Sequence, residues 1–262
     1  MPEGHTIHRV ARDHRRLFAG QQTAMSSPQG RFETEARELS GSVLQDVSAH
    51  GKHLFYHWSE HQMIHVHLGL YGKFRLHKNP APQPRGAVRL RMMGRERTFD
   101  LNGPNRCRLI DRDQFLQILS RLGPDPLSAK SDPDLAWDRI QKSRSPIGTL
   151  LLNQSVIAGI GNVYRAEILF LLGIDPETPA HCLERSTFDR MWELTVRLMK
   201  LGVKYNSIIT VPPVPGQSPR RLRAAERLNV YKQAVCPNCS QPIENWNLGN
   251  RTIYACRKCQ TR

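Results

Sequence analysis

Ala158-Gly159-Ile160-Gly161-Asn162 is the stretch that is most informative about the fold of this 262-residue chain. Two glycines spaced by one residue also occur in dinucleotide-binding loops, but such a loop follows a β-strand and carries a third glycine. Here the preceding residues, Pro146 to Asn153, predict a helix, and the third glycine is missing. A dinucleotide-binding fold is therefore excluded. The pattern predicts a tight turn that leads into a second helix, Val163 to Leu172.

The predicted turn also suggests a ligand. The backbone N–H groups at the start of a helix, together with its positive end, can receive a phosphate. Asn162 is either a cap of this helix or a direct phosphate contact, and the residues leave both interpretations open.

The chain is strongly basic. Lys and Arg number 38 against 23 Asp and Glu, which gives a net charge of +15. Such an excess favours a polyanionic partner, nucleic acid before membrane, although positive charge can also serve solubility alone. No stretch approaches the roughly 20 apolar residues that span a bilayer, and the N-terminus is too polar for a signal peptide. We therefore expect a cytoplasmic protein with reduced thiols and no membrane partner.

The order of the predicted elements indicates an α+β protein. An apolar stripe from Ile7 predicts a helix that stops at Gly20, and Thr187 to Leu201 predicts another. Between about residues 31 and 111, short alternating segments predict an antiparallel sandwich. These segments are Gly51 to Trp58, Met63 to His67, Lys73 to His77, Val88 to Met92 and Arg97 to Leu101. Prolines and glycine in Val211 to Arg223 suggest a mobile basic loop.

Four of the six cysteines form two knuckles, Cys236-Pro-Asn-Cys239 and Cys256-Arg-Lys-Cys259, separated by sixteen residues. This spacing is typical of one tetrahedral Zn²⁺ site, and a reducing compartment disfavours the alternative of two disulfides. Four thiolates leave no open coordination position, so the zinc would be structural. Cys107 and Cys182 are expected to be buried small apolar residues.

The chain starts with Met1-Pro2-Glu3. If Met1 is removed, Pro2 presents a secondary amine that can attack an aldehyde-level carbon and form an iminium ion. Glu3 would be the adjacent group that moves protons. Alternatively, these residues are an ordinary polar start.

Two weaker signals lie in the predicted sandwich. Lys52, between Gly51 and a strand, is either a solvated charge or a second phosphate ligand. His65 and His67 share one face of a strand, where they could bind a metal, contact a phosphate or form a plain polar face. The last two interpretations are favoured.

Four motifs occur in one order along the chain. They are Met1-Pro2-Glu3-Gly4, His67-Leu68-Gly69-Leu70-Tyr71-Gly72, the run Asn153-Gln154 to Gly161-Asn162-Val163-Tyr164 with Glu167, and the terminal cysteine module. With them the chain resembles the formamidopyrimidine-DNA glycosylase and endonuclease VIII family over nearly its whole length. The resemblance implies a catalytic β-sandwich domain over residues 1–122, a linker at 123–135, a helical domain with a helix–two-turns–helix at 136–228, and a four-cysteine zinc finger at 229–262.

The resemblance also implies an activity. Family members remove oxidised bases from DNA and cut the strand at the abasic site by β,δ-elimination. Pro2 would attack C1′ of the sugar, Glu3 would assist ring opening, and Lys52 would serve the second elimination. A monomer acting on damaged DNA, duplex or single-stranded, is implied, with His67, Asn162 and Arg251 on its phosphates.

Departures from the family pattern bear on the substrate. The segment Gly103-Pro104-Asn105-Arg106-Cys107-Arg108 lacks the aromatic wedge and the first arginine of the 8-oxoguanine branch. Gly4 and Tyr71 are similar to the endonuclease VIII branch, in which one loop enters the duplex. Leu70 and Tyr71 are therefore the expected inserting residues.

Two further departures concern lesion contacts. Gly69 stands where a glutamine is usual, and Thr6 replaces an early glutamate. We expect oxidised pyrimidines and abasic sites to be preferred over 8-oxoguanine. The alternatives are an abasic-site lyase without glycosylase activity and a non-catalytic zinc-finger protein that binds damaged DNA.

Overall fold

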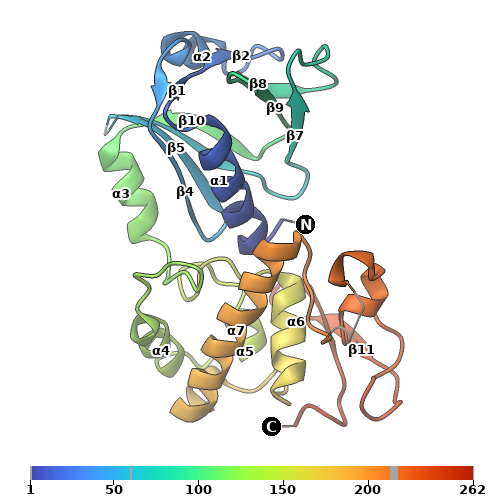
Figure 1. Ribbon diagram of the computed structural model, residues 1–262. Coiled ribbons are helices and arrows are strands. Elements are labelled where there is room, and N and C mark those ends of the chain that lie inside the picture. The colour runs from blue at the N-terminus through green and yellow to red at the C-terminus, as the bar shows by residue number, and fades with distance from the viewer. Residues whose placement is uncertain (1, 60, 213–217, 262) are drawn as a thin grey trace. The chain divides into compact units, whose positions relative to one another are not determined.

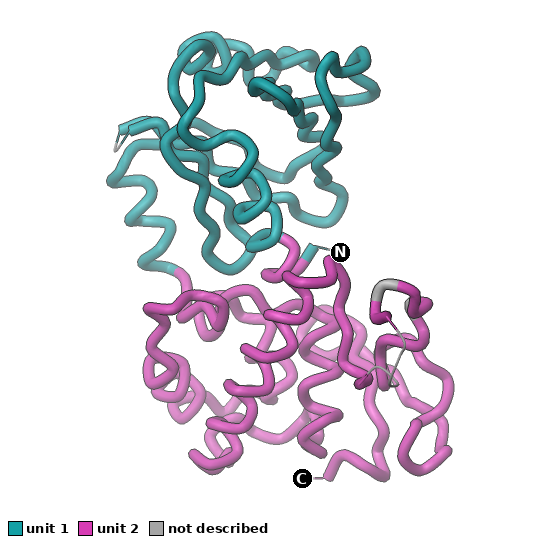
Figure 2. The backbone as a smooth tube through the Cα atoms, viewed as in Figure 1, with its two compact units in different colours: residues 1–2, 7–121 teal, residues 3–6, 122–262 magenta. Residues whose placement is uncertain are grey.

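The computed structural model of the protein describes residues 2–59, 61–212 and 218–261. The chain forms two compact units, which Figure 2 shows in separate colours. The first comprises residues 1–2 and 7–121, and the second comprises residues 3–6 and 122–262. The short segment Glu3–Thr6 therefore packs with residues that lie more than a hundred positions further along the chain.

The first unit is the predicted antiparallel sandwich. Within the described residues, its two four-stranded sheets have the orders β10-β6-β5-β4 and β2-β8-β9-β7, and β1 pairs with β3. The elements are α1 (Gly4–Phe18), β1 (Gln21–Gln22), β2 (Ala24–Ser26), α2 (Glu33–Leu39), β3 (Val43–Leu44), β4 (Asp46–His50), β5 (His53–Ser59), β6 (Gln62–His67), β7 (Lys73–Lys78), β8 (Val88–Met93), β9 (Arg97–Asn102), β10 (Arg106–Ile110) and α3 (Arg112–Ser120). The five predicted strand segments and the first helix are confirmed.

Alternate side chains of both sheets point into one apolar core, which α1 completes. Its members include Leu54, Tyr56, Ile64, Val66, Leu90, Met92, Phe99 and Leu101. His14 of α1 is buried there, with its ring stacked on Phe99 at 4.7 Å and Nδ1 hydrogen-bonded to the Tyr56 hydroxyl at 2.6 Å. Burial lowers the pKa of His14 to about 3, so this core histidine is neutral at physiological pH.

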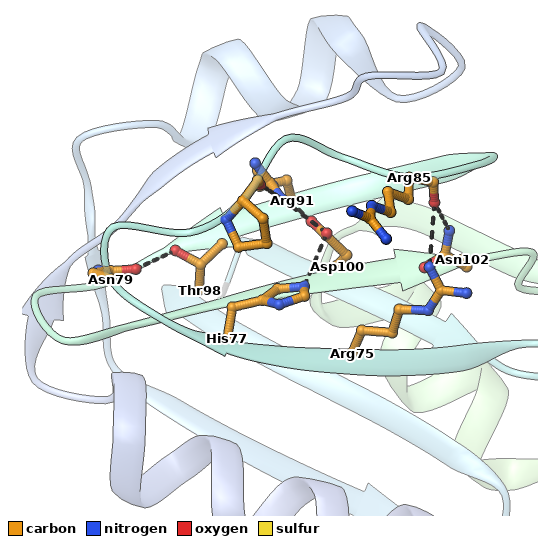
Figure 3. A network of polar contacts seen from close by, with 9 residues as sticks. Arg75, His77, Asn79, Arg85, Arg91, Thr98, Asp100 and Asn102 are labelled. Carbon is orange, nitrogen blue, oxygen red and sulfur yellow. Dashed lines mark hydrogen bonds and ion pairs between the residues drawn. The ribbon is translucent and has the colours of Figure 1, made fainter.

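A polar network covers the other face of the second sheet (Figure 3). The buried carboxylate of Asp100 pairs with Arg91 at 2.6 Å and with His77 at 3.2 Å. Arg91 also donates to the carbonyl of Pro82 at 2.8 Å. The network therefore ties the proline-rich connection between β7 and β8 to the sheet beneath it.

The second unit is built from helices and one hairpin. Its elements are α4 (Pro133–Gln141), α5 (Ile147–Leu150), α6 (Asn162–Leu171), η1 (Ala180–Cys182), α7 (Arg185–Tyr205), η2 (Pro219–Arg221), η3 (Ala224–Arg227), β11 (Glu244–Asn247) and β12 (Thr252–Ala255). Helices α6 and α7 pack side by side around an apolar core (Figure 1). Helix α5 ends well before Asn153, where its predicted span ended, because turns occupy the residues that follow it.

The structure also bears on the predicted linker, on the two remaining cysteines and on the predicted loop. The segment 123–135, predicted as a linker, contains the buried Asp125 and the start of α4, and it packs as part of the second unit. Cys182 is exposed, so its predicted burial is wrong, whereas Cys107 of the first unit is buried as expected. Residues 213–217 of the predicted mobile loop lie outside the described residues. No helix in the described part of the chain is long and apolar enough to cross a membrane.

Candidate functional site

Glu3 lies at the start of helix α6. Its side chain is fully buried, and its carboxylate accepts hydrogen bonds from the N–H groups of Gly161 at 2.9 Å, Val163 at 2.9 Å and Tyr164 at 3.4 Å. The first N–H groups of a helix have no partner inside the helix and carry partial positive charge, so a carboxylate complements them. The expectation that these N–H groups receive a phosphate is therefore wrong, because Glu3 occupies them.

The glycine of this turn is required by the same contact. A Cβ on Gly161 would lie 2.4 Å from Cδ of Glu3, which no side chain tolerates. On the other side of Glu3, the N–H of Gly4 donates to the carbonyl of Gly159 at 2.9 Å. The Gly-x-Gly pattern therefore makes room for the start of the chain and does not form a phosphate loop.

His5 and Tyr164 close this end of the site. The two rings meet edge to face at 5.4 Å, and both side chains are buried. Burial lowers the pKa of His5 to about 4, and burial together with the charge of Glu3 raises the pKa of Tyr164 well above its usual range. Both groups are therefore neutral at physiological pH.

Asn162 is the first residue of α6, and Gly161 takes the cap position. The Asn162 side chain makes no cap hydrogen bond; its amide donates to the carbonyl of Thr252 at 2.8 Å, and its oxygen accepts from Arg165 at 2.6 Å. The cap interpretation is therefore wrong. Asn162 instead ties the helix to strand β12 beside Arg251, so two of the predicted phosphate contacts are brought together.

Arg165 organises this junction, and the sequence reasoning missed it. Its guanidinium group is fully buried and donates to five acceptors, the Asn162 oxygen and the carbonyls of Gly148, Leu248, Arg251 and Thr252. Burial lowers its pKa to about 10, so the group stays charged. The signal that could have revealed it is an arginine three residues after Asn162, in a predicted helix that is mostly apolar.

Glu167, two residues after Arg165 in α6, is a second buried carboxylate. It accepts from the N–H groups of Asn229, Val230 and Tyr231 at 2.8 to 2.9 Å and from the hydroxyl of Thr210. It therefore anchors the chain segment that leads into the cysteine module.

The four knuckle cysteines form a cluster. The Sγ atoms of Cys236, Cys239, Cys256 and Cys259 lie within 4.8 Å of one another. Cys236 and Cys259 are 3.8 Å apart, and Cys239 and Cys256 are 3.5 Å apart. Both distances are too long for disulfide bonds of about 2.05 Å. The cluster could hold one metal ion, and within the described residues no other group of three or more potential ligands does so.

Lys52 and His67 lie near each other in the first unit. Lys52 is half-buried in the turn between β4 and β5, and β5 pairs with β6 so that His53 faces His67. Burial first, and then the positive charges of Lys52 and Arg106, lower the pKa of His67. A neutral His67 can offer a phosphate one hydrogen bond but no full charge.

His65 does not belong with a ligand site. Its ring is buried, stacks on Phe55 at 5.0 Å and is hydrogen-bonded to His53, with 2.9 Å between Nε2 of His65 and Nδ1 of His53. Burial, followed by nearby charges, lowers its pKa to about 3. His65 is therefore a neutral packing residue, and a metal pair with His67 receives no support.

Leu70 and Tyr71 lie in the connection between β6 and β7. Their side chains are 53% and 82% exposed, so two adjacent apolar residues face the solvent. They share the first unit with Pro2, Lys52 and His67, whereas Glu3, Asn162 and Arg251 belong to the second.

Family profiles match most of the chain. The profile described as formamidopyrimidine-DNA glycosylase N-terminal domain matches residues 1–111, and the one described as formamidopyrimidine-DNA glycosylase H2TH domain matches residues 122–212. The protein named endonuclease 8 1 of Mycobacterium tuberculosis (strain H37Rv) is 47% identical over 268 residues, with both chains fully covered. The chain belongs to the formamidopyrimidine-DNA glycosylase and endonuclease 8 family.

The family also includes more distant relatives of this chain. A formamidopyrimidine-DNA glycosylase of Bacillus licheniformis is 28% identical over 241 residues, covering 87% of this chain and 84% of that protein. Among solved structures, the Lactococcus lactis glycosylase in complex with DNA containing an oxidised pyrimidine has a TM-score of 0.83 at 25% identity, with both chains fully covered. The same enzyme with abasic-site DNA has a TM-score of 0.80. The chain is thus a member of a family of base-excision DNA glycosylases, and its structural neighbours are DNA complexes.

Proposed function

We propose that this protein removes oxidised bases, pyrimidines above all, from DNA and then cleaves the strand at the abasic site. The observation that carries the proposal is the anchoring of Glu3, directly after Pro2, at the start of α6 by three N–H donors. A carboxylate so deeply buried at a chain start, in a family of DNA glycosylases, supports a catalytic role for the pair.

The proposed chemistry begins with the Pro2 amine, which is available once Met1 is removed. Its nitrogen attacks C1′ of a nucleotide extruded from the duplex, and the base leaves. Glu3 assists opening of the deoxyribose by transferring a proton. The resulting iminium ion acidifies the C2′ proton, so that the 3′ phosphate is eliminated. Lys52 serves the second elimination, which releases the 5′ phosphate.

The proposed DNA contacts lie on both units. His67, Asn162 and Arg251 would hold phosphates near the lesion, which fixes the position of the DNA without reading its bases. Leu70 and Tyr71 would fill the space that the extruded nucleotide leaves. Their exposure supports this role, since adjacent exposed apolar side chains can mark an interaction site.

The preference for oxidised pyrimidines rests on the loop sequences. The connection from Gly103 to Arg108 offers no aromatic wedge, and residues 69–71 supply the only exposed apolar pair of the described connections between the two sheets. The name of the 47%-identical relative, endonuclease 8 1, is in keeping with this preference.

We further propose that the four cysteines bind one structural Zn²⁺. Tetrahedral Zn²⁺ with Zn–S bonds of about 2.3 Å places thiolates roughly 3.8 Å apart, close to the 3.5 and 3.8 Å of the two cysteine pairs. Such a metal would stabilise the hairpin that carries Arg251. The protein would act as a cytoplasmic monomer on duplex or single-stranded damaged DNA.

Borohydride trapping on abasic-site DNA tests the central claim. Reduction of the iminium ion should give a covalent protein–DNA adduct, which Pro2→Gly should reduce strongly. The matched control keeps Pro2 but blocks its nitrogen with an uncleaved N-terminal tag, and it should bind DNA yet form no adduct. An adduct of normal yield with the tagged protein would rule out Pro2 as the nucleophile.

The two alternatives give different outcomes in the same experiment. An abasic-site lyase would form the adduct but release no base from thymine glycol duplexes. A non-catalytic binder would form no adduct at all. Faster release of 8-oxoguanine opposite cytosine than of thymine glycol would contradict the proposed substrate preference.

A further inference from the structure

The exposed pair Leu70–Tyr71 belongs to one of two chain connections that cross between the sheets of the first unit. Residues 68–72 join β6 to β7, and residues 103–105 join β9 to β10. Strand β10 pairs with β6, with Arg106 opposite His67, and β9 pairs with β7, with Asn102 opposite Lys73. Because both connections start and end on paired strands, they run side by side.

Two backbone hydrogen bonds hold the first connection. The carbonyl of Leu68, a buried residue, accepts from the N–H of Gly72 at 3.0 Å and from the N–H of Asn105 at 3.3 Å. A Cβ on Gly72 would lie 2.3 Å from that same carbonyl oxygen, so the closed turn admits only glycine there. The Leu68 carbonyl therefore binds an N–H group from each of the two connections.

The Asn105 side chain lies directly over Gly69. Gly69 has a φ of +66°, and a Cβ added to it would lie 2.7 Å from Cβ of Asn105. Position 69 thus faces two constraints, a left-handed backbone and a neighbour that fills the space of any side chain. This explains why a glycine precedes the exposed pair.

We propose that Asn105 is a positioning residue that holds the Gly69 turn so that Leu70 and Tyr71 stand ready for insertion in the free protein. The inference rests on the proposed function only in that the pair enters DNA. A connection ordered before binding avoids an entropic cost on binding. Fixing one residue's backbone corresponds to about a fivefold to thirtyfold change in an equilibrium constant.

A double-mutant cycle tests the proposal. The probe is a duplex with a tetrahydrofuran abasic analogue and 2-aminopurine as its neighbour, whose fluorescence rises when insertion unstacks it. Asn105→Gly should weaken insertion about fivefold to thirtyfold. Gly69→Ala should weaken it strongly in the wild-type background and clearly less in the Asn105→Gly background, since the clash is then gone.

Gly30→Ala is the matched control. Gly30 has a φ of +81°, and nothing lies within 4 Å of an added Cβ, so the change introduces backbone strain in the same unit without a steric partner. Its effect on thermal stability calibrates the strain part of Gly69→Ala, and it should leave insertion unchanged. Equal effects of Gly69→Ala in both backgrounds would overturn the proposal.

Amide hydrogen exchange provides a second measurement that needs no DNA. In the free protein, Asn105→Gly should speed exchange at the Gly72 N–H, which is hydrogen-bonded to Leu68, while strand β5 keeps its protection. Unchanged exchange at Gly72 would show that Asn105 does not order the turn. Neither measurement involves bond cleavage, so a wild-type protein that forms no borohydride adduct would count against the proposed function alone.

Discussion

Replacement of Glu3 by glutamine tests the site at its centre. The carboxylate accepts three N–H groups at the start of α6. The glutamine side chain keeps one acceptor oxygen. Its NH₂ group takes the place of the other oxygen and cannot accept a hydrogen bond from a backbone N–H. The change removes at least one charge-assisted hydrogen bond, about 1.5–3 kcal/mol, and an interaction with the helix end of up to about 2 kcal/mol. Relief of a buried charge offsets part of this loss.

We therefore expect Glu3→Gln to lower the free energy of unfolding by about 2–4 kcal/mol, which is a fall in Tm of roughly 5–12 °C. Calorimetry measures the shift, and thymine glycol release below the transition measures activity. The control is Glu167→Gln, which alters a buried carboxylate within α6, the helix whose start Glu3 contacts. Both variants should lose stability, but only Glu3→Gln should lose base release. A Tm within about 1–2 °C of the wild type would refute the structural reasoning, and equal loss of activity in both variants would refute the catalytic role.

Three other perturbations have defined outcomes. Because burial lowers the pKa of His14 to about 3, against 6.5 in the unfolded chain, its contribution to stability is complete above pH 6.5 and is lost as the pH falls toward 3. From pH 6.5 to 4.5 this one group costs about 2 kcal/mol, and urea titrations should show a shallower pH dependence in His14→Phe; an equal dependence would contradict the burial. Arg165→Met frees carbonyls around the hairpin, so DNA affinity at fixed salt should fall about tenfold, by about 1.4 kcal/mol, and Arg251→Ala should add little in that background; additive effects would exclude positioning through Arg165. Cys256→Ser should reduce bound zinc, measured by mass spectrometry, from one per chain to none, and retained zinc would argue against the four-thiolate site.

Patterns local in the sequence predicted much of the fold. The alternation in β5 to β9 and the stripe of α1 each arise from the spacing of apolar residues, which depends on one element at a time. The cysteine knuckles are local patterns as well. Two residues between a pair of cysteines are enough to bring their two thiols close to each other, so the sequence predicted a metal cluster. The length of helix α5 was overestimated. The turns that follow it also contain buried apolar residues, so periodicity alone cannot show where the helix ends.

For the candidate site, the sequence predicted some of the residues but not the groups they bind. Pro2 and Glu3 could be named from their chemistry, and Asn162 and Arg251 from the family pattern, but their partners could not. Glu3 bonds to Gly161 across 158 positions, Asn162 to Thr252 across 90, and Arg165 to Leu248 across 83.

Residue types and their spacing were thus enough to predict the antiparallel sandwich, the first helix and the cluster of four cysteines. Folding alone assigned the N–H groups of α6 to Glu3 instead of a phosphate, and made Arg165 the link between helix and hairpin. The reason is that a buried charge is stable only where several distant polar groups converge on it. Such convergence is a property of packing in three dimensions and leaves no periodic trace along the chain.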